Sequence, residues 1–423
     1  MLSADAKPER LIFLDWVRIL AFGLLVFYHV GMYYVSWDFH IKSPHAGHAI
    51  EPLMRLTNPW RMDLLFMVSG AATSFMLLRD GATVLLLRLR ARRLLIPLLF
   101  GMLVVVPPQS WLEVSQKYQY TGSYGEFIGL YLAGYKGFCN AAGKCLMLPT
   151  WNHLWFLPYL FLYTALLWLG LRRWPAMLEL LGAAVAKALR GPGLLVWPTL
   201  YLALTLLLLY KSFPQNYSVW GDWFAHSQYL AMFVLGAALA GAPATFAGTS
   251  RDIWRQMVQW RWMALALALA AWLMLVQAAW LVREAQLPMR SIAPWAYSVQ
   301  QWCAIVAAFG FAQVHLNRDG PARRYLTEAV FPVYILHQTL ILLLAHSFAP
   351  LALNPALEGS LLVGLTFALS LAGFEMIRRV RWLRPLFGLQ VIPPVSLDNG
   401  CQGSLNDVTE LSTANQDDLS VRK

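Results

Sequence analysis

The chain has 423 residues, of which 58% are hydrophobic and only 13% are charged. Ordinary soluble proteins carry about 25% charged residues, so this composition excludes a soluble globular enzyme, a disordered protein and a coiled coil. It indicates an integral membrane protein, because only lipid tolerates so much apolar surface. The apolar runs are long and continuous, which predicts helices rather than the short alternating strands of a barrel.

We therefore expect an all-α polytopic protein with about ten transmembrane helices. The first apolar run is too long for a cleaved signal peptide, and no small-residue cleavage site follows it. The ten spans are expected, with boundaries good to a few residues, at about 11–36, 60–79, 93–114, 153–171, 193–211, 226–245, 260–282, 293–315, 327–349 and 358–379.

The formal net charge is +11, from 33 Lys and Arg against 22 Asp and Glu. The basic residues are concentrated before the first span, after the tenth, and in every second loop between them. This positive-inside pattern predicts cytoplasmic termini and explains the charge without a nucleic-acid partner. The pattern gives a short cytoplasmic segment at 1–10, a transmembrane domain at 11–385 and a polar, disordered cytoplasmic tail at 386–423.

The loop at 115–152 is expected on the opposite side of the membrane. Its tyrosines fit an interfacial aromatic belt, and a sugar-stacking platform is the alternative. Cys139 and Cys145 lie in this loop, where an oxidising compartment would allow a small disulfide and a reducing one would leave two thiols. Cys303 is expected to pack inside a span, and Cys401 lies in the tail.

The first span carries ionisable residues, which are costly in lipid and usually face a cavity or a partner. Arg18 and His29 are eleven residues apart and differ by only about 20° around a helix, while Asp15 and His29 differ by about 40°. The three side chains therefore share one face, with His29 roughly 16 Å deeper than Arg18. The structural alternatives are a local Asp15–Arg18 pair and a packing histidine.

Polar residues also interrupt three other spans, and each has a structural alternative. Arg61 could reach the interface, Ser69 and Gly70 could let two helices approach closely, and His337 could bond between helices. The polar and aromatic residues in question are Arg61, Asp63, Ser69 and Gly70 in the second span, His153 and Trp155 at the start of the fourth, and Tyr334, His337 and Gln338 in the ninth.

Five elements in this order resemble the acyltransferase-3 family of membrane O-acyltransferases, and specifically its branch that succinylates periplasmic glucans. They cover residues 11–340. The elements are Asp15 and Arg18 with His29 after ten further residues, the FMVSG sequence from Phe66 to Gly70, Arg90 and Arg93 before Pro97, the HLWFL sequence from His153 to Leu157, and Tyr334 to Gln338. Trp16 stands where the general family often has glycine, as in the glucan branch.

The resemblance implies transfer of an acyl group, succinyl or acetyl, from cytoplasmic acyl-CoA to a glycan outside a bacterial inner membrane, without a metal. His29 would be the general base or a transient acyl carrier, with Arg18 held by Asp15, Ser69 donating to the thioester oxygen and His337 as a second base or orienting group. The other implied residues are Arg88, Arg90, Arg92 and Arg93 for the donor phosphates, and Arg61, Asp63, His153, Trp155 and Tyr334 for substrate.

Two other classes of function fit part of the pattern. Buried His, Arg and Asp also suit a proton-coupled transporter or a flippase for a glycan precursor. A metal-dependent enzyme would use His40, His45 and His48, but their spacing lacks a carboxylate helix motif such as HExxH.

Overall fold

The computed structural model describes residues 11–140, 143, 145–240, 247–284 and 293–390. The chain divides into two units, Met1–Leu389 and Gln390–Lys423. The expected N-terminal segment at 1–10 lies outside the described residues, and so does the expected tail beyond residue 390.

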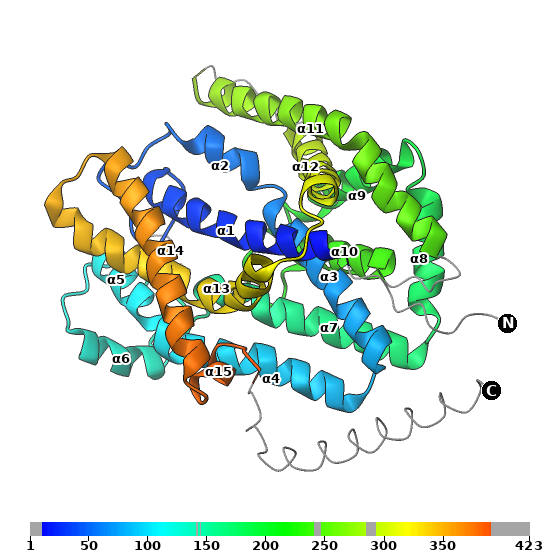
Figure 1. The fold of residues 1–423 in the computed structure, drawn as a ribbon. Coiled ribbons are helices and arrows are strands. Elements are labelled where there is room, and N and C mark those ends of the chain that lie inside the picture. The colour runs from blue at the N-terminus through cyan, green and yellow to red at the C-terminus, as the bar shows by residue number, and fades with distance from the viewer. Residues whose placement is uncertain (1–10, 141–142, 144, 241–246, 285–292, 391–423) are drawn as a thin grey trace, which may run out of the picture. The chain divides into compact units, whose positions relative to one another are not determined.

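The described residues are helical, with no named strand among them and only two isolated β-bridges. This confirms the all-α prediction, and the expected spans fall on helices wherever the structure describes them (Figure 1); only 241–245 of the sixth span lie outside the described residues. The main helices are α1 (Ile12–Tyr34), α2 (Glu51–Thr57), α3 (Arg61–Asp80), α4 (Val84–Phe100), α5 (Pro107–Lys117), α6 (Tyr124–Leu132), α7 (Phe156–Arg173), α8 (Met177–Ala188), α9 (Gly193–Leu209), α10 (Trp223–Ala240), α11 (Ala247–Glu284), α12 (Ala293–His315), α13 (Pro321–Phe348), α14 (Pro355–Arg379) and α15 (Leu383–Leu386).

Within the described ranges, seven helices are long and apolar enough to cross a membrane, or eight if α8 and α9, which are bent by 107°, form one span. The protein is therefore a multi-pass membrane protein. The span expected at 93–114 is two helices rather than one. A π-helical turn at Gly101–Val105 separates α4, which contains Pro97, from α5, which begins at Pro107. Proline removes a backbone donor and crowds the preceding turn, which explains the break.

Helices α1 and α13 run parallel and in register. Asp15 lies beside Arg323, and His29 lies beside His337, so both pairs have the same sequence separation of 308. A strictly alternating chain with only the seven long helices would place α1 and α13 antiparallel. One further crossing between them, such as α8 and α9 as one span, or any other odd number, restores the parallel arrangement. The prediction of ten spans has such an odd number and stays a prediction.

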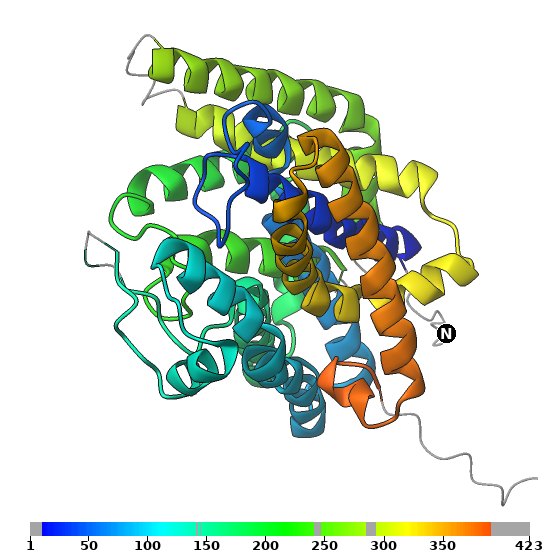
Figure 2. The same cartoon turned by 90° about the vertical axis from the view of Figure 1, so that its left-hand side faces the viewer.

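Helix α1 contacts α3, α12, α13 and α14 (Figures 1 and 2). Its last carbonyls are satisfied from the following loop, because the Lys42 ammonium donates to the carbonyl oxygens of Met32 and Val35. A helix end leaves such carbonyls without partners, and a lysine here also complements the helix dipole. The loop after α1 is therefore tied to the end of the helix that carries His29.

Helices α3 and α10 cross at two glycines. A Cβ added at Gly70 would lie 1.9 Å from the carbonyl oxygen of Phe233, and one added at Gly236 would lie 1.9 Å from that of Met67. The two backbones thus touch at positions where any side chain would separate them. The close approach expected at Ser69–Gly70 is confirmed.

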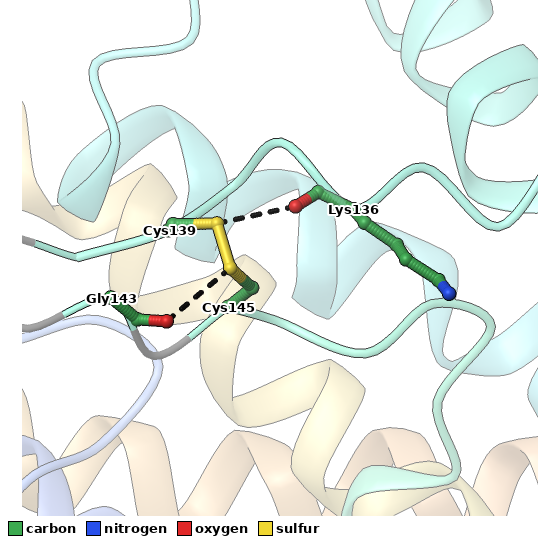
Figure 3. The surroundings of a disulfide bond; sticks show 4 residues. All are labelled: Lys136, Cys139, Gly143 and Cys145. Atoms are coloured by element: carbon green, nitrogen blue, oxygen red, sulfur yellow. Dashed lines mark hydrogen bonds between the residues drawn. A yellow bond between two sulfur atoms is a disulfide. The ribbon is translucent and has the colours of Figure 1, made fainter.

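The segment after α5 forms a small aromatic core of its own. Phe127, Tyr131 and Phe138 are buried there, and the one proton of the Tyr131 hydroxyl lies between two carbonyl oxygens, that of Met102 at 2.8 Å and that of Thr150 at 3.0 Å. Cys139 and Cys145 form a disulfide in this segment (Figure 3). Tyr131 therefore serves packing, whereas Tyr135 and Tyr124 remain exposed.

Candidate active site

Two histidines from distant parts of the sequence meet between α1 and α13. His29 Nδ1 lies 2.9 Å from His337 Nε2, and the ring centres are 5.0 Å apart. His337 is fully buried, whereas His29 keeps part of its surface exposed. Both residues were predicted from sequence as candidate bases, and the structure brings them into direct contact.

The hydrogen bonds define the tautomer of a neutral pair. His337 Nδ1 lies 2.6 Å from the Tyr334 carbonyl oxygen, which can only accept, so Nδ1 carries the proton. His337 Nε2 is then an acceptor and takes the proton of His29 Nδ1. The remaining nitrogen, His29 Nε2, consequently carries a lone pair. This is the arrangement that a general base or a nucleophile requires.

Tyr334 and His153 fix the turn of α13 that carries His337. The Tyr334 hydroxyl donates to the His153 carbonyl oxygen at 2.6 Å, and His153 Nε2 donates to the Ile335 carbonyl oxygen at 3.0 Å. His153 belongs to a short 3-10 turn, Asn152–Trp155, at the start of α7. In the structure, both residues therefore help to position His337. The sequence had assigned them a role in binding substrate.

A polar chain leads away from this site through residues that sequence reasoning did not select. Gln338 Nε2 donates to His40 Nε2 at 2.9 Å and to Gln109 Oε1 at 3.1 Å. His40 Nδ1 lies 2.5 Å from a carboxylate oxygen of Glu113. The available signal was a glutamine and a glutamate within the apolar stretch at 93–114, which is uncommon in a lipid-facing helix.

Glu113 lies in α5, outside the helices that are long and apolar enough to cross a membrane. Burial alone would raise the pKa of its carboxyl, but His40 and Lys117 outweigh burial and lower the pKa to about 2. The Lys117 ammonium lies 3.0 Å from Glu113 and 2.7 Å from Asp38. Glu113 is therefore an ionised partner that holds His40 in one orientation.

At the start of α1, Asp15 has a closer partner than the one expected. Its carboxylate lies 2.5 Å from Arg323 of α13 and 3.9 Å from Arg18. Arg323 is 2% exposed, so the ion pair with α13 is the buried one. The expected Asp15–Arg18 contact is present, and Arg323 is an additional partner that sequence reasoning missed, since a contact across 308 residues leaves no local sequence signal.

The four arginines of α4 are not equivalent. Arg88, Arg92 and Arg93 are exposed, whereas Arg90 is half-buried. Arg93 Nε donates to the Gly388 carbonyl oxygen. Burial, followed by the charges of Arg93 and Arg18, lowers the pKa of Arg90. The guanidinium groups of Arg18, Arg90 and Arg93 thus lie near the N-terminal end of α1. Positive charges gathered in one place favour a bound anion.

The remaining predicted residues surround α3. Asp63 is buried and accepts from Gln301 at 2.7 Å. Ser69 is half-buried beside the glycine crossing. Trp155 packs against Tyr229 with ring centres 5.6 Å apart, and Arg61 lies over the ring of Tyr28.

The three loop histidines do not gather into one site. His40 pairs with Glu113, whereas His48 pairs with Glu51. In the part of the chain that the structure describes, no group of three or more His, Cys, Asp or Glu is placed to hold a metal ion.

Comparison with known protein families decides the class of this protein. Residues 11–375 match the model of a family described as an acyltransferase domain. The chain belongs to the acyltransferase-3 family. This confirms the resemblance at the level of the family, and the acyltransferase-3 domain includes every candidate residue named above. Comparisons with curated proteins and with solved structures gave no match.

Proposed function

We propose that this acyltransferase-3 protein transfers a succinyl or acetyl group from cytoplasmic acyl-CoA to hydroxyls of a glycan outside a bacterial inner membrane. The acceptor would be an osmoregulated periplasmic glucan, as the resemblance to the glucan branch implies. The observation that carries the proposal is the His29–His337 pair, in which hydrogen bonds leave His29 Nε2 free to accept a proton.

The proposed reaction uses that lone pair directly. His29 Nε2 accepts the proton of a sugar hydroxyl as the oxygen attacks the thioester carbonyl carbon. The carbon–sulfur bond then breaks, and the thiolate of coenzyme A takes the proton back from His29 Nε2. The alternative, in which Nε2 attacks the thioester and carries the acyl group, requires the same lone pair.

The donor would enter at the opposite end of α1. Arg18, Arg90 and Arg93 supply the positive charge for the phosphates of coenzyme A, and the pantetheine arm would extend along α1 toward His29. Fourteen residues separate Asp15 from His29, which is about 21 Å of helix. An extended arm would thereby bring a cytoplasmic thioester to a site near the far side of the membrane.

The central test is acyl transfer by the purified protein, followed by mass analysis of the glucan product. We expect His29→Ala to lower the rate by about 10²- to 10⁴-fold. The matched control is His346→Ala, because His346 is exposed on α13 and makes none of these contacts. Turnover retained by a folded His29→Ala protein would remove His29 from the mechanism.

His337 is tested as a positioning residue. We expect His337→Leu to lower kcat while leaving KM for both substrates nearly unchanged, because the His29 ring loses its hydrogen-bond acceptor but the binding surfaces remain. Mass analysis after mixing with donor alone separates the two roles of His29. An acylated His29 peptide supports the acyl carrier, and its absence with normal turnover supports the general base.

The donor site is tested with Arg90→Gln. We expect a higher KM for acyl-CoA and an unchanged KM for the glucan, with Arg172→Gln, an exposed arginine on α7, as the control. Equal donor KM values in the two variants would contradict a specific role of Arg90. Movement of a glycan across vesicles without any covalent product would favour the transporter instead.

A further inference from the structure

Arg61 is a buried cation without an acidic partner. Arg61 is the first residue of α3 and is only 5% exposed. Two of its nitrogens, Nε and Nη1, are buried without a hydrogen-bond partner. Within the described ranges of the chain, no carboxylate lies within 4 Å of its guanidinium group. A buried charge left unpaired is strongly unfavourable, so such a group indicates a place for an anion.

The guanidinium group is held in place by an aromatic ring. Arg61 Cζ lies 3.5 Å from the ring centre of Tyr28, which is cation–π geometry. The Tyr28 hydroxyl in turn donates to Asn58 at 2.9 Å. These contacts fix the position of the charge, but a ring face leaves the donor edge of the guanidinium group unsatisfied. The arrangement is a preformed half of an ion pair.

Arg61 lies close to the reacting histidine. Its Cζ is 3.5 Å from the Tyr28 ring centre, and that centre is 5.7 Å from the His29 ring centre, so Cζ lies within 9.2 Å of the His29 ring. Reacting atoms approach to about 3–3.5 Å, and a charge-assisted hydrogen bond takes about 2.8 Å. Because 9.2 Å is the upper bound, the acyl chain between the two groups can be no longer than about two or three methylene groups.

The position of Arg61 separates it from the expected donor phosphates. His29 lies in the second half of α1, far along the helix from Arg18, and Arg61 lies beside Tyr28, the neighbour of His29 in sequence. An anion at Arg61 would therefore be located beyond the thioester when the donor lies along α1. Asp63, two residues further along α3, accepts a hydrogen bond from Gln301 and forms no ion pair with Arg61.

We infer that Arg61 binds a carboxylate at the far end of the transferred acyl group, so that the protein selects a dicarboxylic acyl donor over an uncharged one. The inference rests on the proposed acyl transfer. It narrows the proposed donor from succinyl- or acetyl-CoA to succinyl-CoA. It gives Arg61 the role of a specificity-determining residue. His29 acts as the base or nucleophile, and Arg61 determines which acyl group is transferred.

The test compares succinyl-CoA with butyryl-CoA, which has the same number of acyl carbons but no carboxylate, using a neutral glucan acceptor. We expect the wild-type protein to have a kcat/KM about 10- to 100-fold higher for succinyl-CoA. Arg61→Gln should abolish that preference, because it lowers kcat/KM for succinyl-CoA and leaves kcat/KM for butyryl-CoA unchanged. Arg61→Lys, which retains the charge but not the fork, should keep part of the preference.

The control is Arg55→Gln on the neighbouring α2, because Arg55 also lies over an aromatic ring, Trp37, but is paired with Glu51. Equal use of both donors by the wild-type protein would overturn the inference without needing a folded variant. An equal loss of kcat/KM for both donors in a folded Arg61→Gln protein would also overturn the inference. The same holds for a loss of kcat/KM that appears only with an anionic acceptor. Product from neither donor would instead refute the proposed function.

Discussion

The glycine crossing of α3 and α10 gives a sharp test of the packing. In Gly70→Ala, the new Cβ would lie 1.9 Å from the Phe233 carbonyl oxygen, whereas real Cβ contacts do not fall below 3.0 Å. The obstacle is backbone rather than a flexible side chain, so the helices must separate by about 1 Å. Overpacking typically costs about 1–3 kcal/mol, and we expect a value near the upper end.

The free energy of unfolding is measured by denaturant titration in detergent micelles. The matched control is Gly364→Ala in α14, where an added Cβ meets nothing within 4 Å. We expect the control to stay within about 1 kcal/mol of the wild-type protein, since alanine only improves helix propensity there. A Gly70→Ala protein as stable as this control would refute the close contact between α3 and α10.

The same geometry predicts that the two glycines are coupled. Gly236 faces the Met67 carbonyl oxygen with the same 1.9 Å clearance, one turn from the first contact. Once Gly70→Ala has moved the helices apart, Gly236→Ala meets less obstruction. The double variant should therefore be destabilised by less than the two single losses together, as expected for neighbouring sites. Strict additivity would indicate that each side chain is accommodated locally.

Three further predictions concern the ionic contacts of the described structure. Glu113→Gln should lower the free energy of unfolding by on the order of 3 kcal/mol at neutral pH. The loss is fully present above about pH 4.5 and fades as the pH falls toward the folded pKa of about 2. A difference from wild type that persists unchanged at pH 2 would contradict this. Lys42→Met should cost about 1–2 kcal/mol by freeing carbonyls at the end of α1, and unchanged thermal unfolding would show that the cap is dispensable. Asp15→Asn should cost about 2 kcal/mol because Arg323 keeps only one acidic partner. Adding Arg323→Met should recover part of that loss, and no recovery in the double variant would argue against the pair.

Some of the site was predictable because helical periodicity is local. The spacing of Asp15, Arg18 and His29 fixes them on one face of α1, and the structure shows Asp15 and His29 both turned toward α13. The same periodicity located the helices, since an apolar run long enough for a membrane has few other solutions. It failed at 93–114, where prolines and a π-helical turn divide the chain.

The sequence by itself determined the membrane class, the positions of the helices, the shared face of α1 and the family resemblance. Only the tertiary structure decided which groups meet. Arg323 is the close partner of Asp15, His337 sets the tautomer of His29, and Arg61 forms no ion pair among the described residues. The physical reason is that helix geometry depends on residues a few positions apart, whereas a proton's position or an unpaired charge depends on contacts between helices hundreds of residues apart.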